Sequence, residues 1–316
     1  IMPSIGPQMS AVMRKSSELT ARFSFADTPL SRARELYALE RRFWNSGGPK
    51  ISCIMETKVK GPVGQIPIRI YHPQPGKLLC VLVYMHGGGY VVGSIETHDR
   101  IMRELAFRSG CAVVGVEYSL SPEQKFPVAL EETQSVLEWL QRISSNKQAR
   151  VFGLESDKIV LGGDSAGASL SIGTALNCEN RLCGLLLYYG SYGLRDSCSS
   201  RLYGGKDDGM GEKDRDFYLK SYLRSEKDLS DLRLDVLRAS MQKMPPTCLI
   251  SAEMDPFRDD SLALAFMLEQ SGVPVDHYLH KGVLHGFLHY SRMLDAAVIA
   301  LDQGADFLKM CFLKSL

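Results

Sequence analysis

The 316-residue sequence lacks an excess of charge of either sign. It contains 37 Lys and Arg residues against 36 Asp and Glu residues, which gives a formal net charge of +1 at pH 7. Proteins that bind nucleic acid or an anionic membrane surface usually concentrate basic residues in one stretch or on one face. The balance therefore predicts neither nucleic acid nor a membrane as a partner, and it favours a small molecule of little charge.

Long hydrophobic runs are also missing. No segment approaches the ~18 consecutive apolar residues that a membrane-spanning helix needs, and residues 1–23 contain no continuous apolar run of the signal-peptide kind. The eight cysteines are dispersed and form no C-x-x-C pair, which predicts free thiols rather than a disulfide framework. We therefore expect a cytoplasmic protein.

Motifs for metals and nucleotides are equally scarce. The sequence has no H-E-x-x-H, no compact Cys/His cluster and no P-loop pattern, and the glycines at 87–89 do not extend to G-x-G-x-x-G. We expect no cofactor and no metal ion.

What the sequence does contain is an alternation of short apolar segments with helical ones. Residues 128–143 and 259–269 have the periodicity of helices. Continuous apolar strands alternating with helices are typical of a mostly parallel sheet covered on both faces, so the pattern predicts an α/β fold. The predicted strands are residues 66–71, 79–85, 112–118, 159–162, 185–189, 247–252 and 275–279.

Two segments depart from this alternation. Residues 1–48 are polar with two helical stretches, and residues 191–240 are charged, contain glycine and show helix-like pieces at 214–224 and 230–241. We expect both segments to form a helical cap over an α/β core made of residues 49–190 and 241–316.

A serine stands between two close glycines in Gly163-Asp164-Ser165-Ala166-Gly167. This is the G-x-S-x-G pattern, which lifts a serine above the end of a parallel sheet at a sharp turn between a strand and a helix. The segment 159–162 before it and the segment 168–176 after it supply that strand and that helix. A serine hydroxyl is a weak nucleophile that needs a base and hydrogen-bond donors for the oxyanion it creates.

Hydrogen-bond donors for the oxyanion are available directly after this serine and in a loop earlier in the chain. One is the amide of Ala166, and others lie in His86-Gly87-Gly88-Gly89, which directly follows the predicted strand 79–85 and matches the H-G-G-G oxyanion loop of esterases.

A base must follow the serine, because the chain order in this fold is serine, acid, histidine. His285 lies in the segment 281–287, which we expect to be a loop beyond the last predicted strand, and His289 is its main rival.

The acid should follow the strand 247–252. Glu253, Asp255, Asp259 and Asp260 all qualify by position. We favour Asp255, because the proline after it holds it out of the helix, whereas Asp259 and Asp260 can simply complement the dipole at a helix start.

The motifs HGGGY, GDSAGA, DPFRDD and LHGF together resemble the hormone-sensitive-lipase-like (type IV, GDXG) esterases of the α/β-hydrolase superfamily. LERRFWN (39–45), THDRIMR (97–103) and FLHYSRM (287–293) are most similar to the bacterial acetyl esterases of that family. The resemblance covers nearly the whole chain beyond the first thirty or so residues.

The resemblance implies a serine esterase with an N-terminal cap that cleaves short acyl esters without a cofactor. The implied catalytic residues are Ser165, Asp255 and His285, and the implied oxyanion-hole amides are those of Gly88, Gly89 and Ala166. Enterobacterial acetyl esterases are also associated with a maltose-system transcription activator, so the resemblance implies a regulatory protein partner. Two alternatives stay open, a binding or regulatory protein on a hydrolase scaffold and a lipase or amidase with the same triad. The oligomeric state is open as well.

Overall fold

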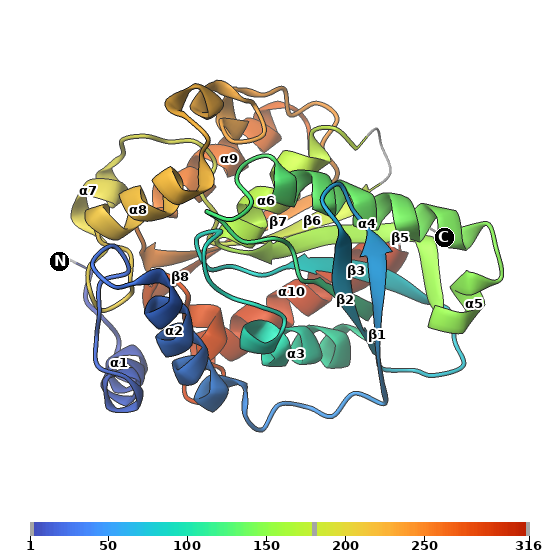
Figure 1. Ribbon diagram of the computed structural model, residues 1–316, viewed down its shortest axis with the longest axis horizontal. Helices are drawn as coiled ribbons and strands as arrows, with labels where there is room; N and C mark the ends of the chain where they lie inside the picture. Colours follow the sequence, from blue (N-terminus) through green and yellow to red (C-terminus); the bar gives the residue numbers. More distant parts are fainter. Residues whose placement is uncertain (1–2, 179–181, 314–316) are drawn as a thin grey trace.

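The computed structural model describes residues 3–178 and 182–313, and it confirms the α/β fold. Within these residues the strands form one eight-stranded sheet in the order β1-β2-β4-β3-β5-β6-β7-β8 (Figure 1). The pairs β1/β2 and β2/β4 are antiparallel, and all other neighbours are parallel. The strands are β1 (Cys53–Lys60), β2 (Gln65–His72), β3 (Leu79–Met85), β4 (Ala112–Val116), β5 (Leu154–Asp164), β6 (Leu182–Tyr188), β7 (Thr247–Met254) and β8 (Val275–Leu284).

Helices cover both faces of this sheet. In Figure 1, α4, α6 and α9 lie on one face, and α3 and α10 lie on the other. The α-helices are α1 (Pro7–Leu19), α2 (Leu30–Asn45), α3 (Asp99–Ser109), α4 (Val128–Ser144), α5 (Gln148–Phe152), α6 (Ala166–Ala175), α7 (Cys198–Leu202), α8 (Glu212–Tyr222), α9 (Arg258–Gln270) and α10 (Asp295–Leu313). Short 3₁₀ helices are η1 (Glu96–His98), η2 (Glu226–Ser230), η3 (Val236–Arg238) and η4 (Phe287–Tyr290).

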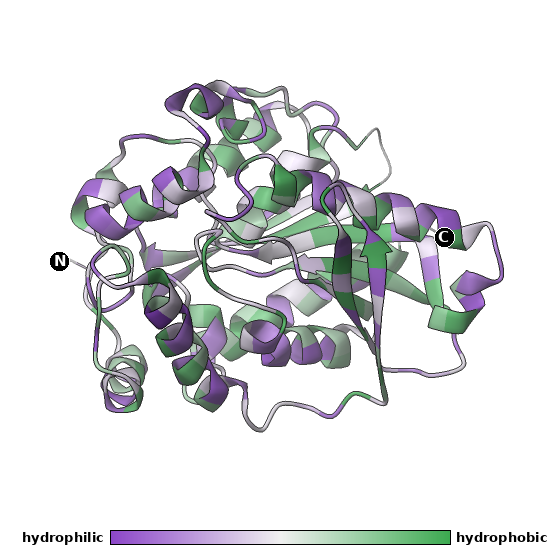
Figure 2. Ribbon diagram, viewed as in Figure 1, coloured by the Kyte–Doolittle hydropathy of each residue, from purple (hydrophilic) through white to green (hydrophobic). Residues whose placement is uncertain are grey.

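The apolar run of β3 shows why the sheet is covered twice. Val81 and Val83 point into the core beneath α4, α6 and α9, whereas Leu82 and Tyr84 point into the core beneath α3 and α10. Successive side chains of a strand face opposite sides, so a strand buried on both faces is apolar throughout. Figure 2 shows the same division, with apolar strands inside and hydrophilic residues on outward-facing helices.

The seven predicted strands are all present, although several of their bounds differ, and one further strand was not predicted. Strand β8 runs to Leu284 instead of ending at residue 279, because its pairing with β7 resumes after an irregularity and reaches Met254 opposite Leu284. Residues 281–284 are therefore strand, and the expectation of a loop over 281–287 was wrong for them. Strand β1, which pairs with β2 along its whole length, was not predicted.

The helix expected over 230–241 was also wrong. This stretch contains the end of η2 and the short turn η3 instead. Asp231 explains part of the difference, because its side chain accepts a hydrogen bond from the backbone amide of Arg233 and also pairs with that residue's guanidinium. Local side-chain bonds of this kind compete with a continuous helix.

The N-terminal segment (described from residue 3 to residue 48) and the insertion (residues 191–240) lie at the same end of the sheet. Figure 1 shows α1 and α2 on one side of that end and α7 and α8 on the other. The end of α2 is fastened to the core by Asn45, whose carboxamide donates to Thr97 O at 3.0 Å and accepts from Arg100 N at 2.8 Å.

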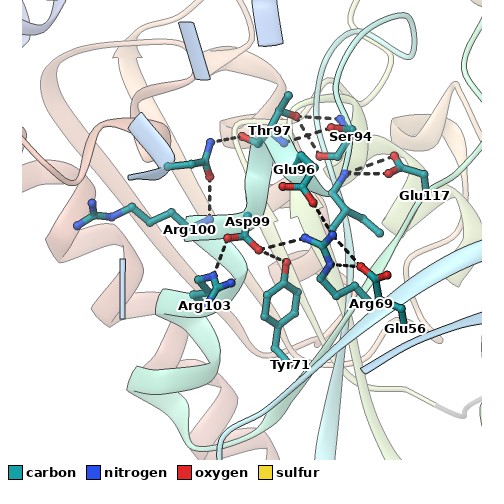
Figure 3. Close-up of polar contacts among 12 residues, drawn as sticks. Glu56, Arg69, Tyr71, Ser94, Glu96, Thr97, Asp99, Arg100, Arg103 and Glu117 are labelled. Atoms are coloured by element: carbon teal, nitrogen blue, oxygen red, sulfur yellow. Dashed lines mark hydrogen bonds and ion pairs between the residues drawn. The ribbon is translucent and has the colours of Figure 1, made fainter. Parts of the chain in front are cut away.

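A network of charges holds the neighbouring part of the core in place (Figure 3). Arg69 on β2 pairs with Glu56, Glu96 and Asp99, and so ties η1 and the start of α3 to the sheet. Glu117 accepts from the amide of Ile95 at 3.3 Å and fixes the same turn from the other side. Helix α2 is therefore hydrogen-bonded to a turn, η1 and the start of α3, that is itself held to the sheet.

Candidate active site

Ser165 occupies the sharp turn between β5 and α6. Its backbone has φ 54° and ψ −119°, a left-handed conformation that costs energy for any residue but glycine. Its amide donates to Tyr188 O on β6 at 2.8 Å, which holds the turn against the neighbouring strand. The side chain is thereby placed beyond the carboxyl end of the sheet.

The structure brings the three candidate catalytic side chains into one hydrogen-bonded chain. Ser165 Oγ lies 2.8 Å from His285 Nε2, and His285 Nδ1 lies 2.7 Å from Asp255 Oδ2. The three residues follow β5, β7 and β8, whose carboxyl ends lie at the same edge of the sheet. This convergence is what the order of the motifs predicts.

Burial and charge act in opposite directions on His285. Only 8% of its surface is exposed, and this burial by itself disfavours the imidazolium form. The carboxylate of Asp255, which is fully buried, outweighs that effect through its charge and its hydrogen bond, so the pKa of His285 is raised above its ordinary value. The pair therefore favours an imidazole that readily takes up a proton.

The other three carboxylates that qualified by position are engaged elsewhere. Glu253 accepts from the amide of Gly282 at 2.8 Å, and Asp259 accepts from the amide of Ser199 at 2.8 Å. Asp260 accepts from the amide of Tyr192 at 2.8 Å, and burial raises its pKa to about 7. Glu253 thus holds β8, Asp259 holds the start of α7, and Asp260 holds the chain after β6, instead of orienting a histidine.

The glycine loop after β3 leaves room for a ligand to reach its amides. Gly88 has φ 127°, and a Cβ placed there would lie 2.1 Å from Val92 O, so no other residue fits. Among the described residues, the amides of Gly88 and Gly89 donate no backbone hydrogen bond. The amide of Ala166 is the first of α6, where helical N–H groups lack an internal partner. All three amides are therefore available to an oxyanion.

Comparison with known proteins identifies the family to which this arrangement belongs. Residues 82–289 match a family model described as the alpha/beta hydrolase fold. An acetyl esterase of Salmonella paratyphi B is 40% identical, with 95% of this chain and 96% of that protein covered, and one of Salmonella choleraesuis is 42% identical over 89% and 87%. The solved structure of a hyperthermophilic esterase from Pyrobaculum calidifontis superposes with a TM-score of 0.89 at 29% identity, covering 98% of this chain and 99% of the other.

The chain belongs to the α/β-hydrolase family. The match confirms the resemblance to hormone-sensitive-lipase-like esterases that the motifs carried. It covers the segment from β3 to η4, and so includes the serine turn, the glycine loop and His285.

Beneath the serine of this hydrolase lies a buried polar network that the sequence reasoning missed. Asp164 accepts from Tyr84 Oη at 2.7 Å and from Gly87 N at 3.1 Å, and His98 Nε2 lies 3.1 Å from its other oxygen. Burial alone would raise the pKa of Asp164, but His98, His289 and the Tyr84 hydroxyl together lower it. The second position of G-D-S-A-G, Asp164, and the histidine of T-H-D (97–99) were the available signals.

His289 belongs to this network and not to the catalytic chain. Its Nε2 lies 3.8 Å from Asp164 Oδ2, and burial together with the charge of Arg41 lowers its pKa well below the ordinary value. The ligand-type atoms of His98, Asp164 and His289 lie within 4.8 Å of one another, close enough to hold a metal ion. Hydrogen bonds already account for both oxygens of Asp164, so we interpret the cluster as support for the glycine loop.

His86 shapes the same loop from the other side. Its ring stacks on Tyr118 at 4.2 Å between centroids, its Nδ1 lies 2.7 Å from Gly87 O, and its own carbonyl accepts from Tyr118 Oη at 2.6 Å. Burial lowers the pKa of His86 to about 3, so the ring is neutral.

A cavity of about 500 Å³ opens above Ser165 and His285. Its lining combines the carboxyl edge of the sheet with residues of the N-terminal segment, such as Phe25 and Arg41, and of the insertion, such as Tyr218. The two segments that break the α/β alternation therefore enclose the site together.

Over the described part of the chain, none of the helices combines the length and apolar character that crossing a membrane would require.

Proposed function

We propose that this carboxylic-ester hydrolase removes short acyl groups, acetyl above all, through an acyl-enzyme intermediate on Ser165. The observation that carries the proposal is the hydrogen-bonded chain from Ser165 through His285 to Asp255, at 2.8 and 2.7 Å. The preference for acetyl esters is supported by the curated relatives, which are named acetyl esterases.

In the first half of the reaction, His285 Nε2 takes the proton from Ser165 Oγ as the oxygen attacks the ester carbonyl. Asp255 keeps the ring in the required tautomer and stabilises the imidazolium that forms. The negative charge that develops on the carbonyl oxygen is met by the amides of Gly88, Gly89 and Ala166. His285 then donates its proton to the leaving alkoxide, and the acyl group stays on the serine.

In the second half, water replaces the alcohol. His285 takes a proton from the water as it attacks the acyl-serine, and the same amides stabilise the second oxyanion. The proton returns to Ser165 Oγ as the carboxylic acid leaves, so the enzyme ends as it began.

We further propose that residues 1–48 and 191–240 act together as the cap of the core formed by residues 49–190 and 241–316. Their shared lining of the cavity supports this assignment. The cytoplasmic location and a regulatory protein partner of the maltose-activator kind stay predictions. A pull-down of that activator with the purified hydrolase tests the second.

The test of the proposed function is hydrolysis of a p-nitrophenyl ester series, from acetate to dodecanoate, by the wild type and by Ser165→Ala. We expect fast turnover of the acetate and butyrate esters, and a fall of at least ~10⁴-fold in kcat for the variant, because removing the nucleophile ends covalent catalysis.

Other outcomes would redirect the proposal. Activity that rises with chain length would identify a lipase. Equal activity of both proteins would place the chemistry elsewhere, and no activity in either would favour a binding protein on a hydrolase scaffold.

A further inference from the structure

The loop that carries two of the oxyanion amides contains two consecutive residues in the left-handed region. Gly89 has φ 60° and Tyr90 has φ 66°. Because Tyr90 bears a side chain, this conformation costs energy and persists only where the surrounding structure holds it. What supports these two residues therefore also determines where the Gly89 amide lies.

The carbonyl of Gly88 sets the direction of the Gly89 amide. It accepts hydrogen bonds from the amides of Val91 at 3.0 Å and Val92 at 2.9 Å. The carbonyl and the N–H of one trans peptide point in opposite directions, so these bonds turn the Gly89 N–H away from residues 91 and 92. A shift of this peptide would move an oxyanion donor.

Two tyrosines of helix α8, in the insertion, lie against the two left-handed residues. A Cβ placed on Gly89 would lie 2.5 Å from Cγ and 2.6 Å from Cδ1 of Tyr218, so this ring is in contact with the glycine. The ring of Tyr222 stacks on that of Tyr90, with 3.8 Å between centroids and 6° between planes. Residues four apart in a helix are neighbours on its surface, so one face of α8 covers both left-handed residues.

Helix α8 is itself fastened at both ends. At its start, the buried Asp214 accepts from Ser24 Oγ at 2.8 Å and from Ala26 N at 3.0 Å, which ties the helix to the N-terminal segment. At its other end, Lys125 Nζ donates to the carbonyls of residues 220, 221 and 223, at 3.2, 2.7 and 3.1 Å, which ties it to the core. These bonds keep the two tyrosine rings in place against the loop.

A small apolar cluster holds Tyr218 from its other side. The cluster contains Phe25 and Tyr37 of the N-terminal segment, Tyr218 of the insertion, and Val91 and Val92, which follow the glycine loop. Phe25 packs on Tyr218 with 5.4 Å between ring centroids. Tyr218 is therefore packed between the glycine loop and the N-terminal segment, which restricts its movement.

The ring carbons of Tyr218, and not its hydroxyl, make the contact with the loop. The three atoms that a Cβ on Gly89 would meet are Cγ, Cδ1 and Cδ2 of this ring. The hydroxyl donates to Gly209 O at 3.4 Å, which is long for a hydrogen bond. Phenylalanine can therefore fill the same place, whereas alanine cannot.

We propose that Tyr218 is a positioning residue for the oxyanion hole, which together with Tyr222 holds the Gly89 amide where the transition state requires it. The insertion then takes part in catalysis as well as enclosing the cavity. This inference rests on the proposed ester hydrolysis and adds a residue that supports it. Because every ester forms the same oxyanion, the contribution of Tyr218 to the rate should be similar for all acyl groups.

The test compares p-nitrophenyl acetate with its thionoacetate, in which sulfur replaces the carbonyl oxygen. Sulfur is larger than oxygen and accepts hydrogen bonds weakly, so the thionoester gains little from the oxyanion amides. For Tyr218→Ala we expect kcat on the acetate to fall by about tenfold to a hundredfold with KM little changed, less than the ~10²–10³ for a donor lost outright. The oxo-to-thiono ratio of kcat/KM should fall by about the same factor.

Two further variants of α8 show whether the place of the ring matters. Tyr218→Phe keeps the ring carbons, and we expect it to restore kcat and the oxo-to-thiono ratio to within about threefold of the wild type. Phe217→Ala is the matched control, because Phe217 is the preceding residue, packs against the same apolar cluster and is half-buried like Tyr218. We expect its oxo-to-thiono ratio to equal that of the wild type.

Lys125→Met carries the test even where Tyr218→Ala does not fold. Lys125 lies outside the lining of the cavity, so its loss acts on the reaction through the position of α8. We expect the oxo-to-thiono ratio to fall by about threefold at unchanged KM, the size of effect expected for a lost hydrogen bond.

The opposite results would overturn the proposal. These are an unchanged oxo-to-thiono ratio in Tyr218→Ala, or in Lys125→Met where that variant alone folds, and an equal fall in Phe217→Ala. Faster hydrolysis of the longer p-nitrophenyl esters by Tyr218→Ala, with no loss on the acetate, would show that Tyr218 only limits the acyl group and would overturn it too. Failure of the proposed ester hydrolysis is distinct, since the wild type would then leave p-nitrophenyl acetate intact.

Discussion

At the floor of the cavity, the reactive side chains bond to one another, whereas the wall formed by α2 and Tyr189 leaves polar atoms without partners. Ser165, His285 and Asp255 are joined by hydrogen bonds of 2.8 and 2.7 Å. In contrast, the Nε of Arg41 and the hydroxyl of Tyr189 have no partner among the described residues. The reactive side chains at the floor are thus held by their own hydrogen bonds, whereas these two atoms of the wall are buried without such a bond.

The difference separates two tasks of the enzyme. Catalysis needs groups held in a fixed geometry, because small displacements of reacting groups cost large factors in rate. Specificity needs groups whose hydrogen bonds are made by the right ligand and left unmade by the wrong one. Changes at the floor should therefore lower the rate for every ester, and changes at the wall should alter the ranking among esters.

The largest effect on the floor, after loss of the serine itself, is expected from Asp255→Asn. An amide at this position can hold His285 in the wrong tautomer, so we expect kcat to fall by about 10⁴-fold. The measurement is kcat on p-nitrophenyl acetate. Asp259→Asn is the matched control, since Asp259 bonds to the Ser199 amide and not to a histidine. Equal losses in the two variants would show that Asp255 has no special role.

A smaller loss is expected from Asp164→Asn, one layer below the serine. Asp164 accepts from Gly87 N and so positions the glycine loop, and losing one oxyanion donor typically costs ~10²–10³ in turnover. We expect kcat to fall toward that range with KM little changed. Tyr84→Phe, which removes one hydrogen bond to Asp164, should have a milder effect in the same direction. A rise in KM at constant kcat would contradict a positioning role.

The sequence predicted the floor far better than the wall. Ser165 and His285 were located because chemistry imposes fixed spacing around a nucleophile and a fixed chain order on its base. Asp255 was favoured over three neighbours by one proline, and the distances to His285 now support that choice. The chain order also placed His285 after the last strand, although that strand proved five residues longer than expected, ending at Leu284 instead of residue 279.

Arg41 shows why the wall escaped prediction. In the sequence it is one of two adjacent arginines, and only the helix geometry of α2 turns Arg41 inward and leaves Arg42 in solvent. The Nε of Arg41 lacks a hydrogen-bond partner because of how α2, η4 and the sheet pack, and these elements are distant in the chain. The insertion was hard for a related reason, because Asp231 and its neighbours make local turns where helix-forming residues suggested a helix.

The titration of His285 is expected to lower kcat/KM tenfold for each pH unit below its pKa. Activity needs the neutral imidazole as base, and the pKa of His285 is raised, so kcat/KM should fall as the pH drops through a value above the ordinary 6.5. The measurement is the pH profile of kcat/KM for p-nitrophenyl acetate between about pH 5 and 9. If kcat/KM begins to fall only below pH 6.5, the carboxylate of Asp255 does not outweigh the effect of burial on the pKa of His285.

The smallest expected effect is on stability, where His285 and His289 should contribute to the free energy of unfolding at opposite ends of the pH range. The raised pKa of His285 contributes stability that is present at pH values below about 6.5 and is lost as the pH rises through its folded value. The pKa of His289 is lowered, so its contribution is present above about 6.5 and is lost as the pH falls. Urea unfolding of the wild type, His285→Gln and His289→Gln across this range measures both. The destabilisation by His285→Gln should shrink toward alkaline pH and that by His289→Gln toward acid pH, and parallel curves would mean that the two histidines do not differ in this way.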